Sequence, residues 1–199
     1  PLEDRNAVVC RLTVSAEGEV TQAEIVLALV QSKAKLSYPE VEDVFQEKAP
    51  HTFTDELSHL QNCFRALRQR REACELVIEH RPEHRWIMND EKQITSIERV
   101  EKKSSQLLVE ECMVAANRAI ANALKEAQRP GPFVTHAGIR RDRAEEAQEF
   151  LKRYQPDLEG LEFSTLEGSR TLITALNASS DERPLRSMVN RLMARASLS

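Results

Sequence analysis

The sequence of 199 residues has no long apolar run and no excess of positive charge. A segment that crosses a bilayer needs roughly 18–20 consecutive apolar residues, and no stretch of this chain approaches that length, so we expect no association with a membrane. The formal net charge is −4, and the bulk charge therefore does not indicate a nucleic-acid-binding protein. Apolar residues make up 41% and charged residues 30% of the chain, which is typical of a globular domain of ordinary size.

Both ends of the sequence lack the features of a natural terminus. The first residues, Pro1–Arg5, contain no apolar signal region and no initiator methionine. The last residues, 192–199, stop inside a predicted amphipathic helix. We interpret both ends as cut.

Closely spaced cysteine pairs are also missing. Four cysteines are scattered along the chain, at Cys10, Cys63, Cys74 and Cys112. This pattern favours a reduced, cytoplasmic protein over a disulfide-bonded one. A zinc site made of Cys63, Cys74, His80 and His84 would have suitable ligand types. However, ten residues separate its two cysteines, where zinc fingers have two to four, so zinc is the weaker interpretation.

Hydrophobic periodicity predicts an α+β fold in which helix dominates and the strands form a mixed or antiparallel sheet. Alternating apolar residues around a turn at Gly18 predict a β-hairpin over 8–30. Ser37 is expected to cap a short helix with a proline in its first turn. The predicted helices cover about 39–46, 55–75, 104–128, 142–154, 168–178 and 182–199, and short strands are predicted over 86–88, 93–98 and 133–136.

Two of these helices have apolar stripes. In helix 55–75 the stripe consists of Leu57, Leu60, Phe64 and Leu67, and the arginines are expected to point away from it. In helix 104–128 the stripe consists of Val109, Met113, Ile120 and Leu124, with Glu110 and Asn117 on or beside it. Those two polar residues lie about 10 Å apart along the helix axis, so each needs another partner. An unpaired buried polar group costs about 1–3 kcal/mol. A structural role and a functional role both remain open for them.

Further candidates for binding residues lie outside the helices. Lys33 and Lys35 precede Tyr38 at the start of a predicted helix. Such a segment can follow phosphates and end in a stacking platform, although a capping loop with a packed tyrosine is the simpler interpretation. His136 ends a predicted strand, where a structural role is more common than a catalytic one. The sequence has no Ser/His/Asp arrangement, no glycine-rich phosphate loop and no cluster of carboxylates. The residues by themselves therefore predict only an α+β domain.

Three segments in register resemble the ribonuclease II (RNB) family. Residues 32–38, SKAKLSY, resemble its SKARLTYEEV stretch, and residues 109–117, VEECMVAAN, resemble its IEEFMLLAN helix. Residues 133–136 sit where the family has its LYRxH strand. The resemblance covers nearly the whole chain. It implies that residues 1–199 are the central part of one RNB-type catalytic domain, without a cold-shock or S1 domain.

The resemblance implies an activity for the complete protein. The family hydrolyses single-stranded RNA processively from the 3′ end to nucleoside 5′-monophosphates, and an aspartate cluster holds its Mg²⁺. Neither that cluster nor the family's TSPIRRY segment occurs in these residues, so we expect the chain alone to be inert and to hold no metal. The alternative is a non-catalytic relative that binds RNA or a protein. An aspartate cluster encoded upstream of Pro1 would favour the enzyme.

The resemblance also implies roles for individual residues. Tyr38 matches the tyrosine that stacks on a base near the 3′ end, with Lys33 or Lys35 meeting the RNA backbone, and His136 matches the strand histidine at the RNA. Ile139 stands where ribonuclease II has a phenylalanine that completes an aromatic clamp, so the second aromatic face is missing.

The motif helix is expected to be mainly structural. Its residues Glu110, Glu111 and Asn117 match the family segment that supports the floor of the active site. The hairpin over 8–30 and the strands near Trp86 should belong to a larger sheet. Because unpaired strand edges template further pairing, we expect self-association through them.

Overall fold

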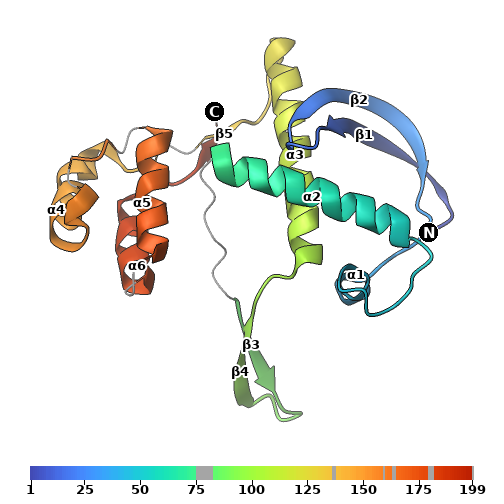
Figure 1. The fold of residues 1–199 in the computed structure, drawn as a ribbon, viewed down its shortest axis with the longest axis horizontal. Helices are drawn as coiled ribbons and strands as arrows, with labels where there is room; N and C mark the ends of the chain where they lie inside the picture. Colours follow the sequence, from blue (N-terminus) through green and yellow to red (C-terminus); the bar gives the residue numbers. More distant parts are fainter. Residues whose placement is uncertain (75–82, 136–137, 159, 163–164, 179–181, 199) are drawn as a thin grey trace. The chain divides into compact units, whose positions relative to one another are not determined.

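The computed structural model describes residues 1–74, 83–135, 138–158, 160–162, 165–178 and 182–198 (Figure 1). The chain forms two compact units, one made of residues 1–70 and 79–129 and the other of residues 71–78 and 130–199. Helices and small antiparallel sheets make up the described residues, so the fold class is α+β, as the sequence predicts.

The first unit consists of two hairpins and three helices. Strands β1 (Asp4–Val14) and β2 (Val20–Gln31) form the first hairpin, and β3 (Glu83–Met88) and β4 (Ile94–Val100) form the second. The helices are α1 (Tyr38–Phe45), α2 (Thr54–Cys74), which ends beyond the unit's boundary, and α3 (Ser104–Glu126). In Figure 1 the β1–β2 hairpin curves beside α3, and the β3–β4 hairpin projects away from the helices of this unit.

The β1–β2 hairpin has one covered and one open face. Val9 and its partner Val26 are partly buried, whereas the neighbouring cross-strand pair, Val8 and Leu27, is exposed. Leu27 keeps 87% of its surface. Successive residues of a strand point to opposite faces, so one apolar face of this hairpin lies open.

The turn between β1 and β2 requires glycine. Gly18 has φ +78°, in the left-handed region that other residues rarely adopt. It also lies against α2, since a Cβ built on it would stand 2.1 Å from the carbonyl oxygen of Ala66. Arg70 on α2 pairs with Glu19 in the same turn at 3.5 Å. The turn is therefore held directly on the helix.

The second unit is a small helical body around one core. Its helices are α4 (Ala144–Tyr154), α5 (Leu166–Ala178) and α6 (Glu182–Leu192), with the short 3₁₀ helices η1 (Arg141–Arg143) and η2 (Pro156–Leu158). Strands β5 (Val134–Thr135) and β6 (Ser197–Leu198) pair antiparallel. The core side chains come from all three α-helices: Ala147, Phe150, Leu151, Leu172, Ile173, Leu176, Leu185, Val189 and Leu192.

Two predictions about secondary structure were wrong in detail. The helix predicted over 182–199 ends at Leu192, and residues 197–198 form β6 instead. The chain leaves the helix there because residues 192–194 pair with residues 138–140, with Arg140 N donating to Leu192 O at 2.9 Å. The described strands pair antiparallel, one of the two arrangements predicted, but they form three separate two-stranded sheets and not one sheet.

No helix in the described part of the chain is both long and apolar enough to cross a membrane.

Candidate functional site

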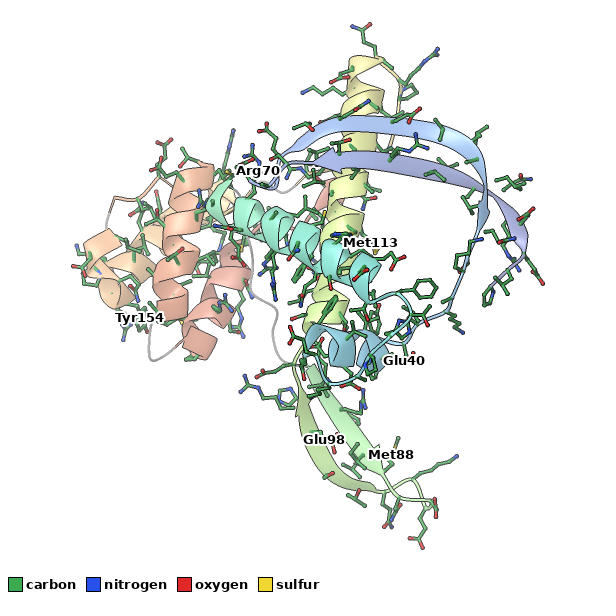
Figure 2. All side chains as sticks on the ribbon, turned by 45° about the vertical axis from the view of Figure 1, so that its right-hand side comes forward. Glu40, Arg70, Met88, Glu98, Met113 and Tyr154 are labelled. Carbon is green, nitrogen blue, oxygen red and sulfur yellow. The ribbon has the colours of Figure 1, made fainter. Side chains whose placement is uncertain are left out.

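A groove in the first unit brings together residues from the start of α1 and from one face of α3. Its volume is about 420 Å³. Figure 2 labels Glu40 on α1 and Met113 on α3, the two helices that border it. The lining residues are Tyr38, Lys102, Gln106, Val109, Glu110, Met113, Val114 and Asn117. The groove thus brings together three candidates that the sequence analysis named on two different segments: Tyr38, Glu110 and Asn117.

Local capping fixes the backbone that carries Tyr38. Ser37 caps α1, and Glu40 completes a capping box in which Ser37 N donates to Glu40 Oε2 at 2.6 Å. The pKa of Glu40 is lowered, chiefly by this backbone hydrogen bond and then by the Ser37 side chain. Tyr38 is the first residue of the helix and keeps 48% of its surface. The ring is therefore carried on an ordered helix end with one side accessible.

A buried carboxylate joins the two helices of the groove. Glu42 on α1 accepts a hydrogen bond from the backbone N–H of Ser105, in the first turn of α3, at 3.1 Å. Its other carboxylate oxygen accepts from Gln46 Nε2 at 2.9 Å. A carboxylate at a helix N-terminus satisfies free N–H groups and favours the helix dipole. Glu42 therefore holds α1 against the beginning of α3.

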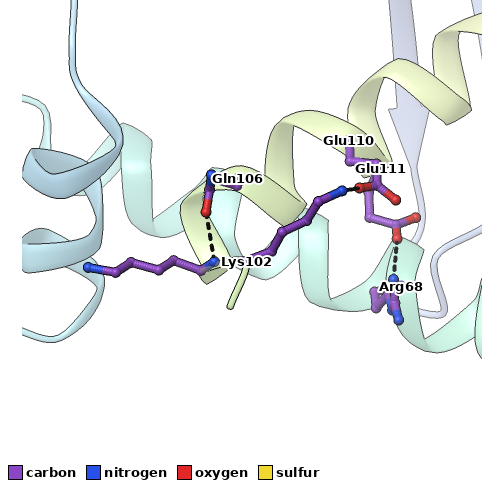
Figure 3. Close-up of polar contacts among 6 residues, drawn as sticks. Arg68, Lys102, Gln106, Glu110 and Glu111 are labelled. Atoms are coloured by element: carbon purple, nitrogen blue, oxygen red, sulfur yellow. Dashed lines mark hydrogen bonds and ion pairs between the residues drawn. The ribbon is translucent and has the colours of Figure 1, made fainter. Parts of the chain in front are cut away.

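The wall of the groove on α3 is partly charged. Lys102 Nζ donates to Glu110 Oε2 at 3.1 Å, and Gln106 Oε1 accepts from Lys103 N at 2.9 Å (Figure 3). Asn117 is exposed at the far end, and Met113 is 60% exposed between them. An aromatic ring, an apolar patch and several hydrogen-bonding groups in one groove can hold a nucleoside.

The buried face of α3 differs from the predicted stripe. Its most buried residues are Ser105, Glu111, Ala115 and Ala119, whereas Val109 and Met113 are exposed. Glu111, with 2% of its side-chain surface accessible, pairs at 3.1 Å with Arg68 of α2, which keeps 19% (Figure 3). The expectation that the arginines of α2 point away was wrong for Arg68.

The apolar stripe predicted for α2 is correct at only two of its positions. Leu57 and Phe64 are buried and Leu67 is partly buried, whereas Leu60 is exposed.

The sequence interpretation missed Lys102, Gln106 and Val114 of the groove, and it assigned Val109 and Met113 to the apolar stripe. For Gln106 the signal was present, because positions 106, 110, 113 and 117 recur every three to four residues, the spacing of one helix face. The mixture of polar and apolar side chains on that face concealed it.

The remaining predicted RNA-contacting residues are spread over both units. Lys33 is exposed and donates to Gln31 Oε1 at 2.7 Å, and Lys35 is exposed nearby. His136 lies outside the described residues. Ile139 packs against the core of the second unit.

Among the described residues, the cysteines take part in no metal-site arrangement. Within the ranges that the structure describes, no group of three or more His, Cys, Asp or Glu side chains could hold a metal ion. His80, one of the four residues of the zinc site considered in the sequence analysis, lies outside those ranges. Burial raises the pKa of Cys112, and the nearby Cys63 and Glu111 raise it further. Burial also raises the pKa of Cys63.

The fold and the motif helix define a domain class. Residues 1–199 match the RNB domain family over their whole length. The chain belongs to the RNB domain family.

Its relatives in that family are exoribonucleases. The chain is 28% identical over 186 residues to Exoribonuclease 2 of Erwinia tasmaniensis, covering 89% of this chain and 29% of the relative. It is 31% identical over 143 residues to Ribonuclease R of Escherichia coli K12, covering 68% of this chain and 17% of the relative. The chain thus spans less than a third of the length of either protein.

Solved structures share the fold. Mycoplasma genitalium RNase R in complex with ribose-methylated single-stranded RNA superposes with a TM-score of 0.81 at 18% identity, covering all of this chain and 32% of that one. The same protein in complex with double-stranded RNA gives a TM-score of 0.82 and covers 36% of that chain.

Proposed function

We propose that residues 1–199 are the central part of the catalytic domain of a 3′–5′ exoribonuclease, and that the α1–α3 groove holds nucleotides near the 3′ end of single-stranded RNA. The complete protein would release nucleoside 5′-monophosphates processively. The observation that carries this proposal is the groove itself, because Tyr38 lies in it together with Glu110 and Asn117 of the motif helix. The exoribonuclease relatives and the RNA complexes of Mycoplasma genitalium RNase R support it.

In this groove Tyr38 would stack on a base. Its ring is accessible, and Met113 offers an apolar surface beside it. Lys33 and Lys35, in the segment that leads into α1, would meet phosphates. Glu110, Gln106 and Asn117 supply hydrogen-bonding groups for the sugar or the base edge. Ile139 is not aromatic and packs against the core of the second unit, so we assign the stacking to Tyr38 alone. His136 is proposed as a further RNA contact from the resemblance only.

The family's Mg²⁺ does not fit the described residues of this chain. They include no group of His, Cys, Asp or Glu side chains suited to a metal ion. Glu110 and Glu111 have cationic neighbours, Lys102 and Arg68. We therefore propose that residues 1–199, as an isolated polypeptide, release no nucleotides with Mg²⁺ or Mn²⁺. Nucleotide release from single-stranded RNA that scales with the amount of the purified chain would refute this.

Substitution of Tyr38 tests the groove in the complete enzyme. Stacking of a base on an aromatic side chain contributes about 1–3 kcal/mol, a factor of roughly five to 150 in binding. Tyr38→Ala should therefore weaken binding of short oligonucleotides and change the length of the final undigested product, with the early rate on long RNA nearly unchanged. Tyr38→Phe should behave like wild type. Trp86→Ala is the matched control, because Trp86 is an exposed aromatic residue on the β3–β4 hairpin, outside the groove.

The result also separates the alternative function. If Tyr38→Ala leaves both the end product and the affinity at the wild-type values, then Tyr38 is a packing residue and the groove does not hold RNA. A complete protein that binds RNA in this groove but releases no nucleotides would be the non-catalytic relative. The open apolar face of the β1–β2 hairpin favours self-association or a protein partner in that case.

A further inference from the structure

A second cavity, unrelated to the motif helix, lies within the second unit. Its volume is about 620 Å³, within the range of small-molecule sites. The lining residues are Arg140, Asn190, Arg191, Met193, Ala194 and Arg195. Three of these six side chains are guanidinium groups, and none is acidic.

Backbone pairing brings the three arginines together from distant parts of the sequence. Arg140 N donates to Leu192 O at 2.9 Å, and Ala194 N donates to Gly138 O at 2.8 Å, around a bridge between Ile139 and Met193. Ile139 and Met193 pack on the core beneath. The end of α6 and the residues that follow it are thus fixed beside residue 140, and this places Arg191 and Arg195 at the same cavity as Arg140.

The described residues of the second unit do not neutralise the charge of the cavity. Among the described residues, a carboxylate partner is present for Arg140 alone of the three arginines: its Nε donates to Asp142 Oδ1 at 3.1 Å and its Nη2 to Asp142 Oδ2. A guanidinium has five N–H donors, so three remain on Arg140. Within the described ranges, the side chains of Arg191 and Arg195 form no hydrogen bond or ion pair, and both residues are exposed.

The nearby helix end does not cancel this charge. Arg191 lies in the last turn of α6, and a helix C-terminus carries about half a negative charge. Two full positive charges without carboxylate partners exceed that amount. One of the terminal carbonyls, that of Leu192, is already occupied by Arg140 N.

We propose that Arg140, Arg191 and Arg195 form a phosphate-binding site for the backbone of single-stranded RNA. Guanidinium groups match phosphate oxygens in geometry and charge, and the Asn190 amide can donate beside them. The lining contains no aromatic side chain on which a base could stack, so the site recognises the backbone and not the sequence. The identity of the polyanion rests on the function proposed above, whereas the anion site rests on the arginines.

Salt dependence of RNA binding tests this site. We would measure the affinity of the chain of residues 1–199 for a fluorescent oligouridine between 50 and 200 mM NaCl. Each phosphate contact on a single strand contributes about 0.7 to the slope of log K against log salt. Arg191→Gln/Arg195→Gln should weaken binding at low salt and reduce the slope by about 1.4, whereas Arg191→Lys/Arg195→Lys should keep most of the slope.

The control removes the same charge from another place in the second unit. Lys152 and Arg153 are exposed on α4 and do not line the cavity, so Lys152→Gln/Arg153→Gln should leave the slope unchanged. Circular dichroism should confirm that each variant remains folded. An equal loss of slope in the control would mean that only net charge matters, and the site would be rejected.

Other outcomes separate this site from the groove. Tyr38→Ala should lower affinity at every salt concentration without changing the slope, because stacking releases no counterions. A normal slope in the Arg191/Arg195 variant, with Tyr38→Ala still impaired, would reject the arginine site alone. A reduced slope in the Arg191/Arg195 variant, with normal affinity in Tyr38→Ala, would reject the groove and support the arginine site. If a polyglutamate peptide displaces the RNA as well as unlabelled oligouridine does, the ligand is an acidic protein segment and the RNA proposal is wrong.

Discussion

The ion pair between Arg68 and Glu111 should contribute far more to stability than a surface pair on the same helix. Replacing Arg68 with methionine keeps the bulk of the side chain but leaves the Glu111 carboxylate, which is 2% accessible, without this cationic partner. Removing one partner of a buried pair costs about 3–5 kcal/mol. Arg70, two residues along α2, pairs at 3.5 Å with Glu19, and both are largely exposed. Pairs of that kind contribute about 0–1 kcal/mol.

Urea unfolding of Arg68→Met and Arg70→Met would compare two identical chemical changes in two environments. We expect the midpoint for Arg68→Met to fall by several times the shift for Arg70→Met, with a similar dependence on urea concentration in both. Adding Glu111→Gln to Arg68→Met should recover part of the loss, because the buried charge is then removed. Equal midpoints for the two single variants would show that Glu111 is not buried in solution, and the α2–α3 packing described above would be wrong.

Three further predictions concern the turn, the thiols and the strand edges. Gly18→Ala should destabilise the protein by more than the roughly 1–2 kcal/mol cost of a left-handed residue, because its Cβ would meet Ala66 O. Gly160→Ala, with φ +85° and open space around it, should show only the conformational cost in thermal unfolding. The raised pKa of Cys112 should keep it protonated at pH 8, so iodoacetamide should modify the exposed Cys74 first and Cys112 only at higher pH. Equal labelling rates at pH 8 would contradict this. The open face and edges of the β1–β2 hairpin should cause concentration-dependent association in sedimentation velocity, and a monomer at all concentrations would exclude it.

The sequence predicted elements well and burial less well. The predicted helices 55–75 and 104–128 correspond to α2 and α3 within two residues at each end, because long periodic patterns with clear ends are strong signals. The predicted cap at Ser37 is present, because capping depends on neighbouring residues alone. Local chemistry is therefore readable from local sequence.

The buried face of α3 was not readable in the same way. Ala115 and Ala119 are buried because small side chains let another element approach closely. Glu111 is buried because it pairs with Arg68, and a local pattern cannot predict this pair because the two residues lie 43 positions apart in the sequence. The predicted stripe was defined by large apolar residues. Met113 was therefore expected in the core, although it is exposed. The arginine cavity depends on pairing between residues 138–140 and 192–194, which no local pattern specifies.

The bond between Glu42 and Ser105 has a consequence for protein engineering. It joins residues 63 positions apart, so the two helices that border the groove are held by direct contact and not by the length of the chain between them. Insertions in that intervening chain need not disturb the groove, since longer loops raise the closure entropy only slowly. The turn at Asn89–Lys92, at the tip of the projecting β3–β4 hairpin, is therefore a suitable place for a fluorophore or an affinity tag in single-molecule tests of the proposed RNA binding.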